Sequence, residues 1–174
     1  MIGYFVKQVH KFSSPQLKTA MASLSNLSIS YTPASPVANG PVEVRVQYSV
    51  RFTPMERLLA ANGLWFRVRI GLYDVDTPGN TLENDDLVQT GFMTISSALI
   101  TGAPANNTLH LQFTRTYDRP DLRGPDDDGS EFLETLRAQV CIIPMPRNAH
   151  EVAGMCRLTN YVPIDTQGPT IVPG

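Results

Sequence analysis

The chain has 174 residues with 12 Gly and 14 Pro, and only 17 % of its residues are charged. This length predicts a single domain that buries about 70 % of its unfolded surface, and the composition excludes a long helical coiled coil. The formal net charge of −2 predicts no long-range attraction to nucleic acid, and no run of residues is apolar enough for a membrane span.

Residues 1–23 are predicted to be an N-terminal arm that carries a short helix. Ile2, Tyr4 and Val6 alternate as in an edge strand, and the pair Ser14-Pro15 is typical of a helix N-cap followed by proline. The first residues lack the basic start and apolar run of a signal peptide. We therefore expect a cytoplasmic or virion-type protein.

Seven later segments have apolar residues at every second position, which predicts β-strands with one buried face. The clearest is 42–52, where six apolar residues alternate with Glu, Arg, Gln and Ser. Gly91 interrupts one segment and indicates a bulge or a close backbone approach. The predicted strands cover 24–31, 42–52, 64–72, 87–95, 109–117, 134–143 and 155–162.

A short helix is predicted over 54–61, between two of these strands. Thr53, Pro54 and Glu56 form a capping-box pattern, in which the N-cap hydroxyl and the N3 carboxylate satisfy each other's backbone amides. Because a tight hairpin would not need a helical turn, strands 42–52 and 64–72 are expected in different sheets or at opposite edges.

These elements predict an all-β fold, an antiparallel two-sheet β-sandwich of about seven strands with one or two short helices. The pattern resembles an immunoglobulin-like or C2-like architecture. A jelly roll is the alternative, and a closed barrel comes third. The sandwich is expected over residues 24–162, and 163–174 is predicted to be an extended C-terminal tail.

An acidic loop follows the strand at 64–72, and it suggests a calcium site. Ca²⁺ takes six to eight oxygen ligands, which Asp74, Asp76, Asp85 and Asp86 can supply in part. A second acidic segment, 118–131, is a candidate for the same end of the sandwich. Asp, Asn and Gly are also the ordinary residues of solvated turns, so the loop has a purely structural alternative.

Two strands carry arginines on the faces predicted to be wet. Arg45 and Arg51 share one strand, and Arg67 and Arg69 share the next, where Trp65 has the same parity. Neighbouring strands would give a basic stripe, and Trp with Arg is enriched in protein interfaces. The alternative is a solvated face with pairs between arginine and glutamate.

No catalytic motif is found in the sequence. It has three histidines and two cysteines, and no G-x-S-x-G, H-E-x-x-H, C-x-x-C or P-loop pattern. Cys141 lies in an apolar run and is expected to be buried, and whether it pairs with Cys156 is left open.

The sequence therefore favours a non-catalytic structural or binding protein that self-associates through strand faces and terminal arms, as a coat- or assembly-type homo-oligomer does. The first alternative is a Ca²⁺-dependent, C2-like module that binds lipid or glycan through the 74–86 loop. The second is a hydrolase with a site built from loops. We expect no cofactor apart from Ca²⁺ in the first alternative.

Overall fold

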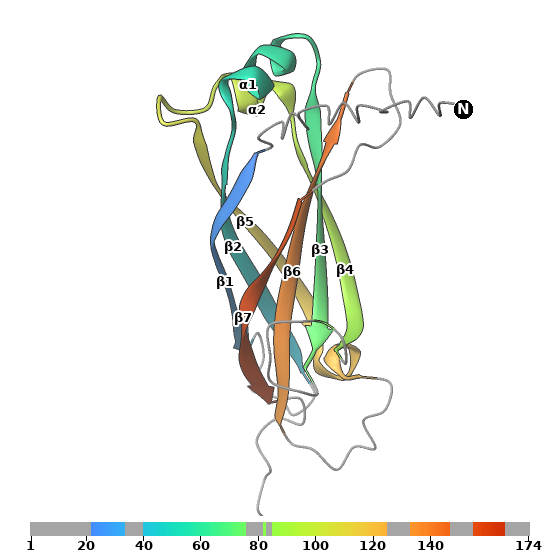
Figure 1. The fold of residues 1–174 in the computed structure, drawn as a ribbon. Coiled ribbons are helices and arrows are strands. Elements are labelled where there is room, and N and C mark those ends of the chain that lie inside the picture. The colour runs from blue at the N-terminus through green and yellow to red at the C-terminus, as the bar shows by residue number, and fades with distance from the viewer. Residues whose placement is uncertain are drawn as a thin grey trace, which may run out of the picture.

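A computed structural model gives the structure of the chain and describes residues 22–33, 40–75, 82, 85–124, 133–146 and 155–165. These ranges form a β-sandwich of two antiparallel sheets, as predicted (Figure 1). The three-stranded sheet has the order β1-β2-β5, and the four-stranded sheet has the order β4-β3-β6-β7. The strands are β1 Ser23–Pro33, β2 Pro41–Arg51, β3 Trp65–Asp74, β4 Asp86–Ile95, β5 Thr108–Asp118, β6 Leu133–Met145 and β7 Met155–Asp165.

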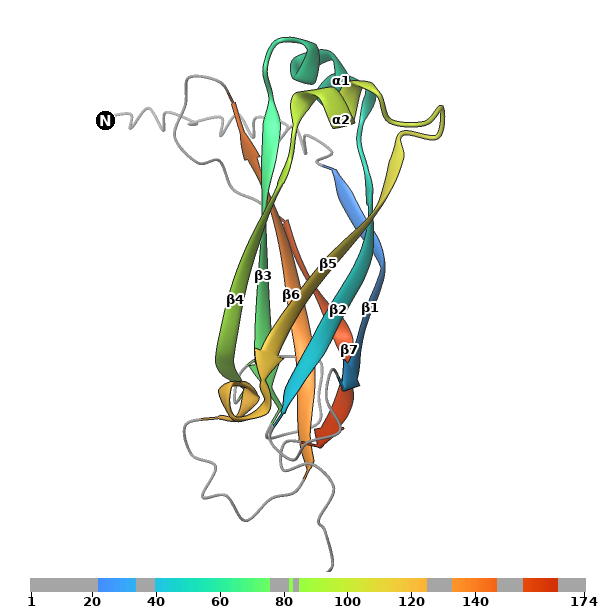
Figure 2. The ribbon, with the colours of Figure 1, turned by 180° about the vertical axis from the view of Figure 1, so that it is seen from behind.

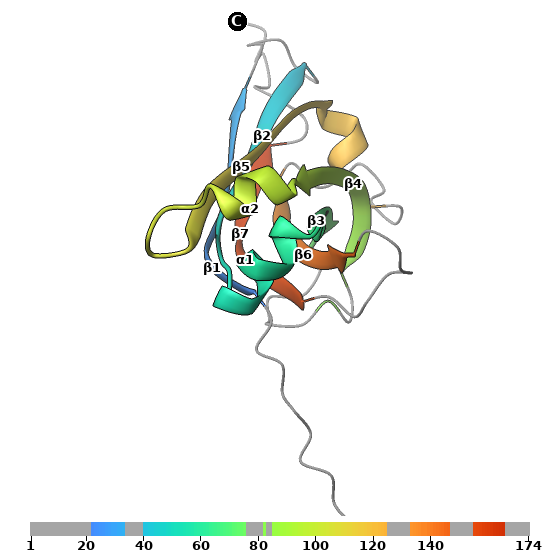
Figure 3. The ribbon, with the colours of Figure 1, turned by 90° about the horizontal axis from the view of Figure 1, so that it is seen from above.

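The two sheets pack face to face, and the view from above shows both layers around one core (Figure 3). Strands β2 and β3 alternate between a buried and a more exposed face, which is why their sequence periodicity is so clear. Rings of Phe52 and Phe66 meet across the core with centroids 5.5 Å apart. Full burial of each such side chain contributes about 1.5–3 kcal/mol to stability.

Helix α1 (Pro54–Ala61) connects β2 to β3 and so carries the chain from one sheet to the other, as the sequence predicted. Its capping box is formed: the Glu56 amide donates to Thr53 Oγ1 over 3.2 Å, and the Thr53 amide donates to Glu56 Oε2 over 2.8 Å. The other carboxylate oxygen of Glu56 accepts a hydrogen bond from the Ala22 amide at 2.8 Å. The cap therefore also fixes the chain just before β1.

A second helix, α2 (Ser97–Thr101), was not predicted. Ser96 caps it by accepting a hydrogen bond from the Leu99 amide, and it packs beside α1 at one end of the sandwich (Figure 2). Five residues are too few to show helical periodicity, so the sequence reads as turn-rich there. At the opposite end, a 3₁₀ turn, η1 (Arg119–Leu122), follows β5.

Gly91 allows the two sheets to approach closely. A Cβ atom at this position would lie 2.4 Å from the Cζ atom of Phe113, which belongs to β5 in the other sheet. The sequence predicted a bulge or a close backbone approach at Gly91, whereas the group that approaches it is a side-chain ring, that of Phe113. The register shift of the β3–β4 pair lies elsewhere, between Leu72 and Tyr73.

A disulfide joins Cys141 of β6 to Cys156 of β7, at positions directly opposite each other in the register. This resolves the pairing that the sequence left open. Cys141 is 4 % exposed, as expected for its apolar run, whereas Cys156 is exposed.

Both predicted terminal segments lie almost wholly outside the described residues. The helix expected after Pro15 falls mostly in the undescribed range up to residue 21, and Ser23, the last residue of the predicted arm, belongs to β1. At the other end, β7 continues to Asp165 and passes the predicted limit at 162. None of the helices in the described ranges has the length and apolar character needed to cross a membrane.

Candidate functional site

At the acidic end of the sandwich, an arginine side chain pairs with an acidic one, which the sequence did not predict. Oδ2 of Asp85 lies 3.4 Å from Nη1 of Arg137 on β6, and both side chains are 2 % exposed. Burial raises the pKa of Asp85, the Arg137 charge opposes that rise, and the Asp86 charge adds to it. Asp74 is also buried, and its Oδ2 accepts a hydrogen bond of 2.8 Å from the Gly124 amide.

This arrangement bears on the predicted calcium ligands. Asp74, Asp85 and Asp86 are described, Asp76 lies outside the described residues, and no three acidic, His or Cys side chains converge as a metal site in the described part of the chain. A calcium ion here would compete with Arg137 for the Asp85 carboxylate. The calcium site stays a prediction, which a rise in melting temperature with millimolar CaCl₂ would support.

The two arginine pairs lie on opposite sides of the molecule, so the predicted continuous basic stripe does not form. Arg45 and Arg51 are exposed on the outer face of the three-stranded sheet, whereas Arg67 and Arg69 lie on the outer face of the four-stranded sheet. The Arg45 guanidinium lies 2.9 Å from the Glu43 carboxylate, an exposed pair of the kind that contributes ~0–1 kcal/mol.

The outer face of the four-stranded sheet is rich in apolar and aromatic side chains. In the register, Arg69 lies opposite Phe92 of β4, and Arg67 lies opposite Ile143 of β6. Directly opposite residues of antiparallel strands share a face, so aromatic, aliphatic and arginine side chains are interleaved there. We call this surface the arginine–aromatic face, and it comprises Trp65, Arg67, Arg69, Leu87, Phe92 and Ile143.

Two members of this face are unusually exposed for their type. Phe92 is 63 % exposed within regular pairing opposite Arg69, and Leu87 is 51 % exposed at the register shift of the β3–β4 pair. Arg69 lies between Phe92 of β4 and Cys141 of β6 in the register. Its Nη2 atom donates a hydrogen bond to Gln139 Oε1 over 3.4 Å, which holds the guanidinium in place. Of the five interaction residues expected from the sequence, Trp65, Arg67 and Arg69 lie on this face, and its members Leu87, Phe92 and Ile143 were missed.

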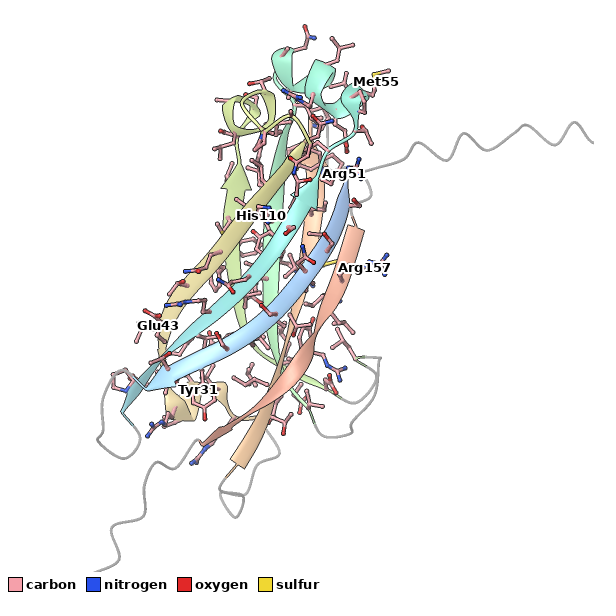
Figure 4. The ribbon with its side chains drawn as sticks, turned by 90° about the vertical axis from the view of Figure 1, so that its left-hand side faces the viewer. Tyr31, Glu43, Arg51, Met55, His110 and Arg157 are labelled. Atoms are coloured by element: carbon pink, nitrogen blue, oxygen red, sulfur yellow. A yellow bond between two sulfur atoms is a disulfide. The ribbon has the colours of Figure 1, made fainter. Side chains whose placement is uncertain are left out.

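The outer face of the three-stranded sheet has the opposite character. It carries polar and charged side chains along β1, β2 and β5, among them those of Glu43, Arg51 and His110 (Figure 4). A concavity of about 370 Å³ lies over its middle. We call this concavity the polar groove, and its outward side chains are Asn26, Ser28, Gln47, Ser49, His110 and Gln112.

A serine and a histidine are hydrogen-bonded in the polar groove. Ser49 Oγ lies 2.8 Å from His110 Nδ1, and the Asn26 side-chain amide donates to the same Oγ over 3.2 Å. Sequence reasoning missed this cluster, because Ser49 and His110 are far apart in the chain and meet only through the β2–β5 register.

A Ser–His contact is the start of a nucleophile and base arrangement, but two observations weigh against catalysis. Ser49 is 2 % exposed, so an incoming carbonyl carbon has no path to its Oγ. A base is normally oriented by a third group, and no side chain in the described ranges hydrogen-bonds His110 Nε2. The contact is a structural bond in this conformation.

The end of the sandwich that carries the helices also exposes apolar side chains. Met55 is 60 % and Leu58 is 61 % exposed on α1, and Leu99 is 49 % exposed on α2. Arg57 lies between the helices and donates to the Thr101 carbonyl oxygen over 2.9 Å. This helical end is a second apolar surface, separate from the arginine–aromatic face.

Comparisons with known proteins do not place the chain in a family. No protein-family model matches it, and no curated protein matches it. One solved structure, titled "X-ray structure of Northeast Structural Genomics Consortium target SoR45", matches 88 % of this chain and 91 % of its own with a TM-score of 0.30 and 6 % identity. A likeness this low carries no argument about function.

Proposed function

We propose that the protein is a non-catalytic assembly subunit that binds further copies of itself through the arginine–aromatic face and its terminal arms. The observation that carries this proposal is the contrast between the two outer faces. One is polar, and the other exposes Phe92 and Leu87 on the same face as two arginines and a tryptophan. Exposed apolar side chains interleaved with Trp and Arg have the composition of interface hot spots.

The chemistry of the face fits a second copy arranged about a two-fold axis. In such a contact, the same face meets itself. Arg69 and Phe92 are cross-strand neighbours, so each arginine of one copy can lie over an aromatic ring of the other. This offset stacking avoids a direct approach of like charges.

The experiment measures oligomeric state against concentration by size-exclusion chromatography with light scattering. Phe92→Ser and Arg69→Glu are expected to weaken association of the full chain at least about tenfold each, as hot-spot truncations do. Leu58→Ser is a matched control, because Leu58 is 61 % exposed but lies at the helical end. Arg51→Glu controls for charge on the polar face.

The contribution of the arms is tested by deleting residues 1–12, residues 166–174, or both. Arm deletion is expected to weaken association further, because an extended apolar segment can add contacts to a neighbouring sheet. A monomer at the highest attainable concentration, with and without these segments, would contradict the proposal. Equal weakening by Leu58→Ser and Phe92→Ser would move the interface to the helical end.

A further inference from the structure

The polar groove is built around a strained residue. The β1–β2 register shifts between Ser25 and Ser28, and within this bulge Asn26 has φ 52°, in the left-handed region. Asparagine tolerates this conformation better than most residues, and bulges often redirect a side chain beside a functional site. Here the bulge points the Asn26 side chain at Ser49 Oγ. Strain of this kind persists where the surroundings fix it, and it clusters at binding sites.

The side chains of the groove offer polar groups without charge. Gln47 Nε2 donates to Gln112 Oε1 over 3.1 Å, and Gln112 Nε2 donates onward to Thr114 Oγ1 over 2.9 Å. These bonds and that of Asn26 use amide N–H groups, so the carbonyl oxygens of Asn26 and Gln47 accept no side-chain hydrogen bond within the described residues. The Nε2 atom of the exposed His110 ring also faces away from Ser49.

The available groups define the chemistry of a ligand. None of the eight residues that line the groove is Asp, Glu, Lys or Arg, so an ionic ligand would find no opposite charge. A hydroxyl group both donates and accepts, and it therefore matches amide oxygens and an imidazole nitrogen side by side. The lining residue Tyr48 offers no ring for stacking, because it is 2 % exposed and its hydroxyl donates to Met93 Sδ inside the sandwich.

We propose that the polar groove binds a neutral, hydroxyl-rich ligand, a short unsubstituted glycan. Asn26, Gln47 and His110 make the direct hydrogen bonds, and Ser49 holds Asn26 and His110 in place. The groove lies on the sheet opposite the arginine–aromatic face, so this binding is independent of the proposed self-association. Without aromatic stacking, the affinity falls in the millimolar range, about 1 mM.

The test uses the full chain, labelled with ¹⁵N and titrated with neutral oligosaccharides followed by amide chemical shifts. The panel comprises maltotriose, cellotriose and xylotriose, with glucuronate and glucose 6-phosphate as charged counterparts. Saturable shifts are expected for at least one neutral sugar, centred on the amides of residues 26, 47 and 110. The charged sugars are expected to bind more weakly.

Variants then assign the contact to the groove. Asn26→Gly keeps the left-handed backbone and removes the side chain, and Gln47→Ala is a second variant that leaves the bulge intact. Each is expected to weaken binding about tenfold, the effect of losing one or two hydrogen bonds. Thr116→Ala is the matched control, since Thr116 is exposed on β5 beyond the groove.

Three results would overturn the proposal. The first is the absence of saturable shifts with every neutral sugar in the millimolar range. The second is a set of shifts that map to the helical end or to the four-stranded sheet. The third is tighter binding of glucuronate or glucose 6-phosphate than of any neutral sugar, because the groove supplies no cation of its own.

Discussion

The Asp85 carboxylate and the Arg137 guanidinium are 3.4 Å apart, and each side chain is 2 % exposed. Asp85 lies just before β4, and Arg137 lies on β6, so the pair spans β3, which separates these strands in the sheet. Taking two charges out of water costs several kcal/mol per ion, and the attraction between them offsets this only while both are present. The pair is therefore a sensitive point of the fold.

Arg137→Met is expected to destabilise the protein by about 3–5 kcal/mol near neutral pH, because Asp85 is left buried without its cation. The pH dependence follows from the pKa of Asp85, which burial already raises. A carboxyl group whose pKa is raised in the folded state stabilises the protein most at pH values below its unfolded pKa. This stabilisation is lost as the pH rises through the pKa of the folded state. In Arg137→Met the pKa of Asp85 rises further, because the opposing Arg137 charge is gone. Asp85 is then protonated at about pH 4, and part of the lost stability returns.

Urea denaturation of four proteins measures this coupling: wild type, Arg137→Met, Asp85→Asn and the double variant. The double variant is expected to be more stable than Arg137→Met alone at neutral pH, because no unpaired charge remains. Strictly additive effects of the two substitutions at both pH values would show that the pair is not coupled.

The Cys141–Cys156 disulfide is expected to stabilise the protein by about 3 kcal/mol, since it closes a loop with a sequence separation of 15. Reduction, or the double substitution of both cysteines by alanine, should lower the midpoint of urea unfolding accordingly. Alkylation followed by intact mass determination should find no reactive thiol before reduction and two afterwards. Two reactive thiols in unreduced protein purified under oxidising conditions would contradict the disulfide.

Gly91→Ala is expected to cost about 1–3 kcal/mol, because the added methyl group overlaps the Phe113 ring. Phe113→Leu should recover part of this loss in the double variant, as it removes the ring atoms that the new Cβ meets. Gly102→Ala is the control, because its Cβ would approach only the Ala98 carbonyl oxygen, at 3.1 Å. Thermal unfolding is measured for Gly91→Ala, Phe113→Leu, the double variant and Gly102→Ala, and equal losses at Gly91 and Gly102 would contradict the close approach.

The sequence predicted the fold well where burial repeats every second residue. In β2, five apolar positions face the core and the intervening ones lie on the outer face, although Ser49 is buried there, so the strand could be predicted from the sequence alone. The capping box at Thr53 and Glu56 was equally readable, because it depends on residues three apart. Helix α2 was missed, since a single turn of small residues has no period.

The candidate sites were harder to predict, because they depend on which strands become neighbours. Arg45 and Arg67 both occupy outward positions of their strands, but the two strands belong to different sheets, so the arginines lie on opposite sides of the molecule. The contact between Ser49 and His110 needs the β2–β5 register, which the sequence does not contain as a local pattern. Phe92 was assigned no role, because one exposed aromatic residue in a strand is distinguished only by its neighbours across the sheet.

Ser49 is expected to be unreactive towards a fluorophosphonate probe, which labels activated serines. Its Oγ is buried, accepts a hydrogen bond from Asn26 and contacts His110. These contacts keep the hydroxyl buried in the wall of the polar groove, where the probe cannot reach it. Ser49→Ala should instead lower stability by about 1–3 kcal/mol, because the polar groups of Asn26 and His110 lose their shared partner. Intact mass after incubation with the probe measures labelling, with a serine protease as the positive control. A stoichiometric adduct on Ser49 that disappears in His110→Gln would contradict the structural role and favour a hydrolase, because only an activated nucleophile depends on its base in this way.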